Sequence, residues 1–349
     1  MEEKKLIVGV ISCSSMAQKH MTGVLAYPNA ELAAVCDIDE AKIEEAITKL
    51  NEEREVPVNP ARYTDYKELL KHPGLNTVII VTPDQLHREM AEAALAAGMH
   101  VLCEKPLALT REDMLAIVKA AKKATGKFMV GQICRFTPSF KKVKEIVESG
   151  QIGELFFVET EYAHDYLHIM TKGGWRSDPI RNGVVGGGCH AVDLLRWIVG
   201  DPIEVMAYGT HKMLPMVDYD DTTVSIMRFP NNVVGKVFVS TGCKRNYTMR
   251  SVFYGTKGTI ICDNKSEYFE LFLMDENDHK AETVPQQIPV EVANHNAVGE
   301  FKCFADAVLS GADVPTDAVA GAKTIAVCMA IVESAKKMEP VKPDYDFSV

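Results

Sequence analysis

The sequence lacks a long apolar run and an excess of basic residues. No uninterrupted apolar run approaches the roughly 20 residues that a helix needs to cross a bilayer. The 349 residues include 38 Lys and Arg against 48 Asp and Glu, which gives a formal net charge of −10. Net negative charge disfavours binding to nucleic acids and to anionic membranes. We therefore expect neither of them as a partner.

Paired cysteines are absent as well. The nine cysteines are scattered singly, no Cys-x-x-Cys occurs, and an odd number suits reduced thiols better than a disulfide framework. The first residues, Met1 to Lys5, lead into an apolar run whose Gly9 and acidic flank fit a first strand better than a signal peptide. We expect a cytoplasmic protein.

The chain is longer than one that typically folds around a single hydrophobic core, so about two domains are expected. Over residues 1–135, apolar β-type runs alternate with helical stretches of about 10 to 15 residues, which predicts right-handed crossovers and a doubly wound parallel sheet. The expected strands are 6–11, 31–36, 77–81, 101–103 and 128–133, and the expected helices are 16–26, 37–50, 65–72, 83–97 and 110–125.

The pattern changes after about Pro138. Six alternating runs between residues 203 and 274, together with the strand 155–163, predict an α+β domain over 136–349 with a large, mostly antiparallel open sheet. Four helices are expected in it, over 140–149, 191–198, 297–309 and 318–336. A sheet with one face uncovered by helices is a natural surface for association, so we expect a homodimer or homotetramer.

The turn between the first strand and the first helix lacks glycines. A dinucleotide-binding fold places Gly-x-Gly-x-x-Gly/Ala there, and this chain has Ser12-Cys-Ser14-Ser-Met16-Ala17. The spacing and the small size are kept, but the Cβ of Ser14 must shift the phosphate or be accommodated by a wider turn. The helix N-terminus attracts an anion in either case. Taken alone, the segment fits a cofactor loop and an ordinary turn equally well.

Asp37 ends the second expected strand, about 20 residues beyond this loop, where a carboxylate accepts hydrogen bonds from the adenosine ribose. An acid at that position repels a 2′-phosphate, so it favours NAD(H) over NADP(H). The alternative is that Asp37 only caps the next helix, a role that Asp39 could equally fill.

Lys105 follows the short apolar run 101–103 as part of Glu104-Lys105-Pro106. Pro106 ends the strand, because it has no N–H to donate. The next segment, 110–113, has the shape of a capping box and opens a helix. Lys105 therefore lies at the carboxyl end of a buried strand, where open parallel sheets bind ligands. The alternative is a surface lysine in an ordinary loop.

Four segments together resemble the signature of the Gfo/Idh/MocA oxidoreductases, a family that includes glucose–fructose oxidoreductase and inositol dehydrogenases. They are Thr82-Pro83-Asp-Gln-Leu-His87, Glu104-Lys105-Pro106, Trp175-Arg176 and Gly186-Gly-Gly-Cys-His190-Ala-Val-Asp193. The resemblance covers nearly the whole chain. It implies an NAD-binding Rossmann domain over 1–135 and a substrate-binding and oligomerisation domain over 136–349, and residues 135–138 resemble the family's turn between them.

The resemblance also implies roles for single residues. Lys105 and His190 match the active-site lysine and histidine of the family, and the Thr82 segment lines the nicotinamide side of its cofactor site. Glu104 is expected to position Lys105 or the cofactor. The NAD site predicted from the motifs and the resemblance comprises Ser12, Ser14, Met16, Ala17, Asp37, Thr82, Pro83, His87, Glu104 and Lys105.

The chain departs from the family at one position. The family usually carries an acid four residues before the histidine, and here that position is Gly186. Asp193 lies three residues after His190 on nearly the same helical face, so it could orient the imidazole, bind a substrate hydroxyl or form a salt bridge elsewhere. Our hypothesis is that His190 accepts the hydroxyl proton and that Lys105 stabilises the oxyanion.

Aromatic and polar residues gather after the strand 155–163. Rings with hydrogen-bonding groups suit a carbohydrate, which has apolar C–H faces and a polar rim. The expected substrate-binding residues are Tyr162, His164, Trp175, Arg176 and Asp193. His164 and His168 have the spacing of two metal ligands on one helical turn, but no further ligand is evident, and we expect no metal.

The sequence thus predicts an NAD-dependent dehydrogenase that acts on a secondary hydroxyl or ketone of a sugar, glycoside or cyclitol. One alternative is a glycosidase in which bound NAD oxidises the sugar transiently. Another is a non-catalytic regulator that binds NAD or sugar. The substituted glycines and Gly186 favour the regulator, whereas the intact Lys105 and His190 argue against it.

Overall fold

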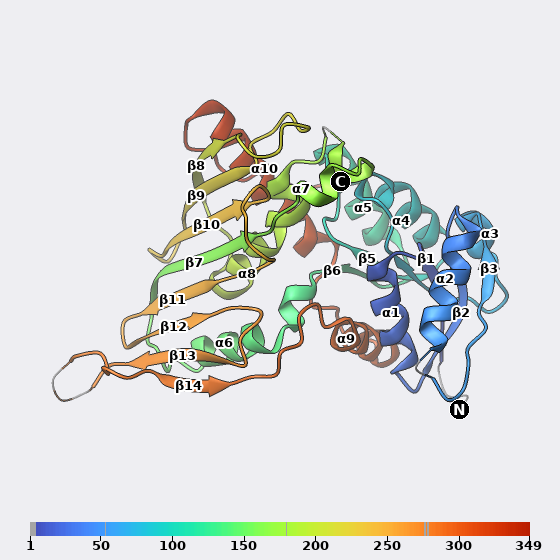
Figure 1. The fold of residues 1–349 in the computed structure, drawn as a ribbon, viewed down its shortest axis with the longest axis horizontal. Helices are drawn as coiled ribbons and strands as arrows, with labels where there is room; N and C mark the ends of the chain where they lie inside the picture. Colours follow the sequence, from blue (N-terminus) through green and yellow to red (C-terminus); the bar gives the residue numbers. More distant parts are fainter. Residues whose placement is uncertain (1–4, 53, 179, 276, 278) are drawn as a thin grey trace. The chain divides into compact units, whose positions relative to one another are not determined.

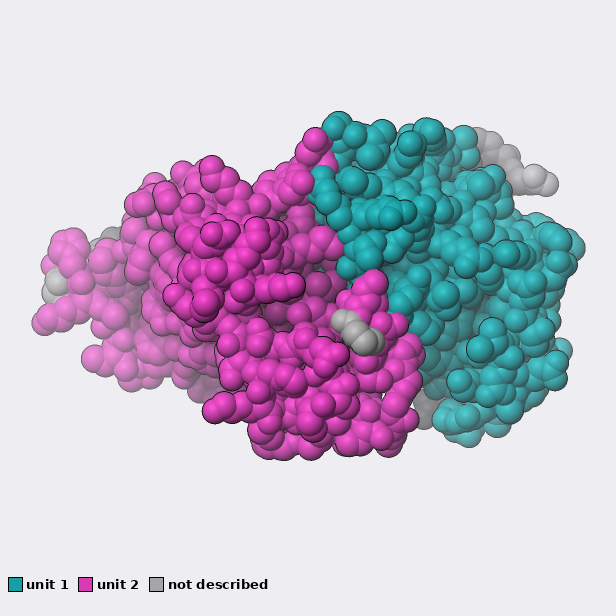
Figure 2. Space-filling view, turned by 90° about the horizontal axis from the view of Figure 1, so that it is seen from above, with its two compact units in different colours: residues 1–133, 296–322, 347–349 teal, residues 134–295, 323–346 magenta. Residues whose placement is uncertain are grey.

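The computed structural model describes residues 5–52, 54–178, 180–275, 277 and 279–349, and these form two compact units (Figure 2). Unit 1 comprises residues 1–133, 296–322 and 347–349, and unit 2 comprises residues 134–295 and 323–346. The first break in the chain lies close to the boundary expected near residue 135. The second domain, however, is not the continuous segment 136–349, because residues 296–322 belong to unit 1.

Unit 1 contains a six-stranded parallel sheet of order β3-β2-β1-β4-β5-β6, which is the order of a doubly wound dinucleotide-binding fold (Figure 1). The predicted fold class is therefore confirmed for this unit. The strands are β1 (Leu6–Ile11), β2 (Ala30–Cys36), β3 (Ala61–Tyr63), β4 (Thr77–Ile80), β5 (His100–Glu104) and β6 (Phe128–Gly131). The helices are α1 (Ser15–Leu25), α2 (Glu40–Asn51), α3 (Tyr66–Leu69), α4 (His87–Ala96), α5 (Arg111–Lys123) and α9 (Ala297–Ser310).

The central strands β1, β4 and β5 of this sheet are almost wholly buried, and every residue of β4 and of the edge strand β6 is buried. Strands covered on both faces read as continuous apolar runs, which is why the sequence revealed them. The short edge strand β3 lies in a segment where we expected no strand. It pairs with β2 over only three residues and alternates between half-buried and exposed positions, so its sequence carries little signal.

Short polar side chains start several helices, as the sequence indicated. The hydroxyl of Thr110 accepts from the N–H of Asp113 and caps α5, which confirms the capping signal there. Asp39 accepts from the N–H of Ala41 and caps α2. Asp37 is therefore not the cap of α2.

The segment 296–322 packs on unit 1 through two sets of contacts. On α1, a Cβ added to Gly23 would lie 2.8 Å from the carbonyl oxygen of Ala297, so only glycine allows α9 to approach so closely. At the edge strand β6, Val130 donates its N–H to Thr316 and accepts the hydroxyl of Thr316 through its own carbonyl. These tertiary contacts place α9 in unit 1, and no local pattern in the sequence reports them.

Unit 2 contains an eight-stranded sheet of order β14-β13-β12-β11-β7-β10-β9-β8, in which only the β7–β10 pair is parallel (Figure 1). The predicted large, mostly antiparallel sheet is confirmed. Its strands are β7 (Leu155–Ala163), β8 (Glu204–Thr210), β9 (Thr222–Arg228), β10 (Val234–Ser240), β11 (Ser251–Gly255), β12 (Gly258–Cys262), β13 (Tyr268–Leu273) and β14 (Gln286–Pro289). The strand β14 was not expected.

Helices cover one face of this sheet: α8 (Cys189–Val199) packs on β7 and β10, and α6 (Pro138–Glu148) packs on β12. On the opposite face the side chains of neighbouring strands line up in register. Tyr208, Val224 and Phe238 form one row across β8, β9 and β10. Residues of β9 alternate strictly between buried and exposed positions, so this face is open within the protomer.

The last helix, α10 (Ala318–Lys337), is long and apolar enough by length and composition to cross a membrane, in a search of the described part of the chain. However, 61% of the tested stretch is buried inside the protein. The core helix of a globular protein has the same properties, so this is weak evidence for a membrane span.

Candidate functional site

The loop between β1 and α1 keeps the shape of a phosphate-binding turn although it lacks glycine. Ser12 adopts a positive φ of 94°, a conformation that favours glycine. Ser14 is the N-cap of α1, and its hydroxyl accepts from the N–H of Ala17 at 3.4 Å. The loop therefore points the free N–H groups of a helix N-terminus at the carboxyl edge of the sheet, where an anion would be held.

Asp37 lies beside this loop. Its Oδ2 accepts from the N–H of Cys13 at 2.9 Å, and its Oδ1 accepts from the N–H of Asp39 at 3.1 Å. Burial, followed by the charge of Asp37, raises the pKa of Cys13 to about 12, so this thiol stays neutral. The position of Asp37 at the end of β2 fits the predicted ribose-binding role, and one of its oxygens also stabilises the loop.

His87 connects two of the recognised motifs. Its Nδ1 lies 2.8 Å from the carbonyl oxygen of Pro106, and its Nε2 lies 3.2 Å from that of Thr82. Burial opposes the charged imidazole, but Cys103, Asp84 and the carbonyl of Pro106 raise the pKa of His87. The side chain is buried, and these two contacts hold the Thr82 and Lys105 segments together.

Lys105 directly follows β5 and is half-buried at the carboxyl edge of the sheet, as predicted. Its backbone N–H donates to Oε2 of the buried Glu104 at 3.1 Å. The other oxygen of Glu104 lies 2.8 Å from Nε2 of His20. The sequence analysis did not single out His20, since a buried histidine on an apolar helix face carries no distinctive signal.

His190 lies in the first turn of α8 in unit 2 and is buried. Its ring stacks with those of Tyr162 and His295, whose centroids lie 5.9 Å and 5.8 Å away. Its Nδ1 lies 3.3 Å from Sγ of Cys134. Neither Cys134 nor His295 was expected at this position, because both come from segments remote in sequence from the histidine motif.

The segment before His190 forms one turn of π-helix, Val184–Gly188, where the sequence indicated only a loop. The guanidinium of Arg181 fills the space beside Gly186. A Cβ added there would lie 2.3 Å from Cζ of Arg181, whose Nη2 donates to the carbonyl of Gly186 at 3.1 Å. A buried cation thus lies where the family usually carries an acid.

Asp193 forms a buried salt bridge. Its two oxygens accept from Nε and Nη2 of Arg135, both at 2.7 Å, and Oδ1 also accepts from the hydroxyl of Thr324. A buried bidentate pair of this kind holds its carboxylate firmly. The predicted role of Asp193 in substrate binding is therefore not supported, and the third alternative, a salt bridge elsewhere, describes the structure.

The predicted aromatic cluster forms within unit 2. The hydroxyls of Tyr162 and Tyr166 lie 2.7 Å apart, and His164 packs against Tyr166 and Tyr247. Burial, followed by the nearby cationic groups of His168, Lys265 and Arg176, lowers the pKa of His164 to about 4, although Asp165 opposes this shift. His164 is therefore neutral at physiological pH.

Trp175 and Arg176 form a short 3-10 helix, Trp175–Ser177, and are partly exposed. The guanidinium of Arg176 lies 4.2 Å from the centroid of the Trp175 ring, and that of Arg181 lies 5.0 Å from it. Stacking of this kind holds both guanidinium groups against the indole ring. Arg181 was not expected here, because arginines in a loop are usually solvated.

A search of the described residues for possible metal ligands finds a group in unit 1 that was not expected, His20, Glu104 and Glu300. The pair His164 and His168, whose spacing was noted in the sequence, does not belong to it. These two histidines differ in their surroundings, since His164 is half-buried in the aromatic cluster and His168 is exposed. The unit 1 group is considered further below.

Comparisons with known proteins identify the family. Residues 6–132 match the model of an oxidoreductase family with an NAD-binding Rossmann fold, and residues 140–261 match that of the GFO/IDH/MocA C-terminal domain. The chain is 27% identical to myo-inositol 2-dehydrogenase of Thermotoga maritima, over 96% of this chain and 98% of that protein. It is also 27% identical to levoglucosan dehydrogenase of Pseudarthrobacter phenanthrenivorans, over 78% of this chain and 81% of that protein.

A solved structure of levoglucosan dehydrogenase, in complex with NADH and levoglucosan, resembles this chain with a TM-score of 0.83. The two chains are 25% identical, and the match covers 97% of this chain and 99% of that one. The similarity therefore extends through both units.

The contacts of Asp37 predict how it affects cofactor choice. Asp37→Asn keeps an oxygen for the N–H of Cys13 but loses the charge that repels a 2′-phosphate. We expect this variant to bind NADPH about tenfold more tightly than the wild type. Its melting temperature should be slightly lower, because the amide nitrogen no longer accepts from the N–H of Asp39. Asp37→Ala should weaken NADH binding as well. Fluorescence titration with both reduced cofactors measures this, and a wild type that prefers NADPH would refute the assignment.

The position of Arg181 predicts that Gly186 does not tolerate a side chain. Gly186→Ala should lower the free energy of unfolding by about 1–3 kcal/mol, because the new Cβ overlaps the guanidinium. In the Arg181→Ala variant, Gly186→Ala should lower the free energy of unfolding by a smaller amount. A double-mutant cycle of denaturant unfolding measures this difference. Gly131→Ala is the control, since its added Cβ would meet no atom closer than 3.4 Å. Equal costs in both backgrounds would disprove the overlap.

Proposed function

Because the chain belongs to the Gfo/Idh/MocA family of NAD-binding oxidoreductases, we propose that it is an NAD-dependent dehydrogenase of a sugar, glycoside or cyclitol. It transfers hydride between nicotinamide and a secondary hydroxyl or ketone. The observation that carries this proposal is the position of Lys105 at the carboxyl end of β5. This is the sheet edge that also carries Asp37 and the N-terminus of α1.

The residues of unit 1 fit the cofactor. The N–H groups at the start of α1 suit the pyrophosphate, and Asp37 suits the adenosine ribose. The turn at Thr82 and Pro83, held by His87, suits the nicotinamide side. When bound, NAD supplies the hydride acceptor for alcohol oxidation.

Removal of hydride from an alcohol carbon requires that the hydroxyl also lose its proton. We assign that proton to His190, whose ordinary pKa suits a base at neutral pH. Because Nδ1 of His190 faces Cys134, Nε2 is the atom that accepts the proton. The ammonium of Lys105 stabilises the developing oxyanion, a role that needs no large change in its own pKa.

The substrate class rests on two observations. The relatives are named for inositol and levoglucosan, both polyhydroxylated rings. The cluster of Tyr162, His164 and Tyr247 beside His190 presents ring faces together with hydroxyl and imidazole groups, which suits such a substrate. Trp175 and Arg176 add a further ring and a cation on the same unit.

A substrate panel tests the proposed activity. Purified protein is incubated with NAD and inositols, levoglucosan, free sugars and aryl glycosides, while NADH absorbance and aglycone release are recorded together. We expect NADH to accumulate with at least one polyol. Aglycone release without NADH would instead indicate a glycosidase, and neither signal would favour a binding protein without catalytic activity.

Lys105→Ala is expected to reduce turnover by about a hundredfold or more, the scale of a lost oxyanion partner or base. Lys119→Ala is the matched control, because this lysine is exposed on α5. The two variants should have similar melting temperatures. Wild-type turnover in Lys105→Ala would remove this lysine from the mechanism.

We also infer that the protein works in the cytoplasm. All nine cysteines have free thiols, and seven of them are buried, where they behave as small apolar residues.

The open face of the unit 2 sheet supports a homodimer or homotetramer. Tyr208, Val224 and Ile226 are 59%, 37% and 44% exposed on neighbouring strands, and an apolar surface of this kind is usually covered by another chain. A second copy of this chain is the occupant we propose, since a flat sheet face is self-complementary about a two-fold axis.

Ile226→Glu should therefore shift the protein to a smaller species in sedimentation velocity, because it places charge in the middle of the proposed interface. Val284→Glu is the control, as this valine is 75% exposed and lies outside the strands. A wild type that sediments as a monomer would refute the interface.

A further inference from the structure

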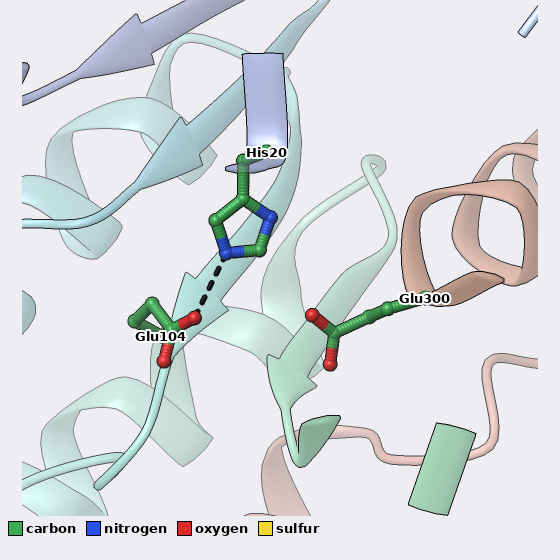
Figure 3. A group of neighbouring side chains, drawn as sticks. All are labelled: His20, Glu104 and Glu300. Carbon is green, nitrogen blue, oxygen red and sulfur yellow. Dashed lines mark hydrogen bonds and ion pairs between the residues drawn. The ribbon is translucent and has the colours of Figure 1, made fainter. Parts of the chain in front are cut away.

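Three ionisable side chains meet in the interior of unit 1 (Figure 3). His20 comes from α1, Glu104 from the end of β5 and Glu300 from α9. One ligand atom from each lies within 4.8 Å of the other two, and their exposed fractions are 0%, 7% and 0%. Burying three such groups is costly unless they interact. None of the roles proposed so far requires His20 or Glu300.

The hydrogen bonds within the group are unevenly distributed. Both oxygens of Glu104 are used, one by Nε2 of His20 and one by the backbone N–H of Lys105. Among the described residues, the two oxygens of Glu300 have no hydrogen-bond partner, and Nδ1 of His20 has none either. In Figure 3 the carboxyl of Glu300 points towards the His20–Glu104 pair. Glu300 is therefore a buried polar group aimed at a charged pair.

The two carboxyl groups differ in charge. Burial, followed by the negative charge of Glu104, raises the pKa of Glu300 well above its ordinary value, although Lys105 opposes the shift. Burial also favours a higher pKa for Glu104, but the effects of His20 and Lys105 outweigh it, and the pKa of Glu104 is lowered. Like charges in one buried site cannot both form at low cost. Burial and charge therefore favour the carboxylate form of Glu104 and the neutral acid form of Glu300.

The packing of α9 explains why Glu300 enters the interior. Ala297 contacts α1 at Gly23, and the ring of Phe301 meets that of Tyr27 edge-on. Because Ala297 and Phe301 both pack on α1, Glu300 on the same side of α9 is directed inwards. The neighbouring charged residues of α9, Lys302 and Asp306, pair with each other on the exposed side. The charged groups that act on Glu300 are therefore Glu104 and Lys105, with His20 beside them.

We propose that His20, Glu104 and Glu300 form one positioning cluster, in which Glu104 is the one carboxylate and Glu300 is a neutral acid. The cluster holds the backbone of Lys105 through Oε2 of Glu104, and the charge of Glu104 favours the ammonium form of this lysine. The proposal rests on the function proposed for Lys105, and it assigns roles to two residues outside the motifs. The proton on Glu300 avoids a second negative charge while keeping a polar group beside Glu104.

A divalent cation bound by the same three residues is the competing explanation, since imidazole and carboxylate are ligands for several metals. The geometry favours the proton. Nε2 of His20 and Oε1 of Glu104 lie 2.8 Å apart, the distance of a hydrogen bond between them. Lys105 already acts on both carboxyl groups, and its positive charge disfavours a second cation beside them.

Infrared spectroscopy of the NAD-bound protein at neutral pH tests the protonation directly. We expect the wild type to show the C=O band of a buried, protonated carboxylic acid. Glu300→Gln should remove this band, and Glu104→Gln should leave it in place. A wild type without the band would overturn the proposal, and so would one equivalent of tightly bound divalent metal in elemental analysis. If a variant does not fold, the wild-type spectrum by itself still tests the proposal.

The second readout is the titration of Lys105 itself. Lysines are reductively methylated with ¹³C formaldehyde, and the resonance absent in Lys105→Arg is followed against pH by NMR. Glu104→Gln should lower the pKa of Lys105 by about one unit, because an opposite charge is lost. Glu300→Gln is the matched neutral control and should shift it by no more than a few tenths. Equal shifts in both variants, or none in either, would overturn the proposal.

Both measurements are made without a substrate. They therefore stay decisive if the substrate panel fails, and the failure of the cluster is distinguishable from failure of the proposed activity. Where an active substrate is found, the pH profile of kcat/KM should be displaced in Glu104→Gln and unchanged in Glu300→Gln. A purely structural role would lower stability without displacing this profile.

Discussion

Two hydrogen bonds to the carboxylate of Glu104 organise the carboxyl edge of the parallel sheet. One comes from His20 in the helix that starts at the cofactor loop, and the other comes from the backbone of Lys105. The same buried charge thus connects α1 to the lysine at the end of β5. A carboxylate out of reach of solvent is stable only if its partners are in place, so the position of Lys105 depends on the packing of α1 and α9 around it.

The imidazole of His190, to which we assign the proton transfer, is held without the acid usual in the family. The rings of Tyr162 and His295 stack with it, and Cys134 lies beside Nδ1. Arg181 fills the space that a side chain at position 186 would need. The imidazole is therefore held by ring contacts and by the thiol of Cys134, and the guanidinium of Arg181 lies where relatives usually carry an acid. We expect the balance of charge at this site to differ from that of relatives that carry the acid.

The predictions made from the sequence succeeded where a signal is local and failed where it is not. The buried strands β1, β4 and β5 read as apolar runs, and Thr110 caps α5 as its spacing indicated. The edge strand β3 and the outer strand β14 were missed, because exposed strands carry no apolar run. Asp193 was assigned to the substrate on its spacing from His190, and Arg135, 58 residues earlier, proved to hold it. The ring contacts of His190 depend on residues 162 and 295, whose proximity no pattern reports.

The sequence by itself determined the class of protein: a doubly wound parallel sheet followed by a largely antiparallel one, and the motif residues Lys105 and His190. Apolar periodicity, caps and spacing are local properties, and a chain displays them before it folds. Only the tertiary structure decided that α9 returns to unit 1 and brings Glu300 to His20 and Glu104, and that Arg181 occupies the place beside Gly186. These arrangements depend on side chains meeting across long separations in sequence, and burial then sets the charge that each group carries.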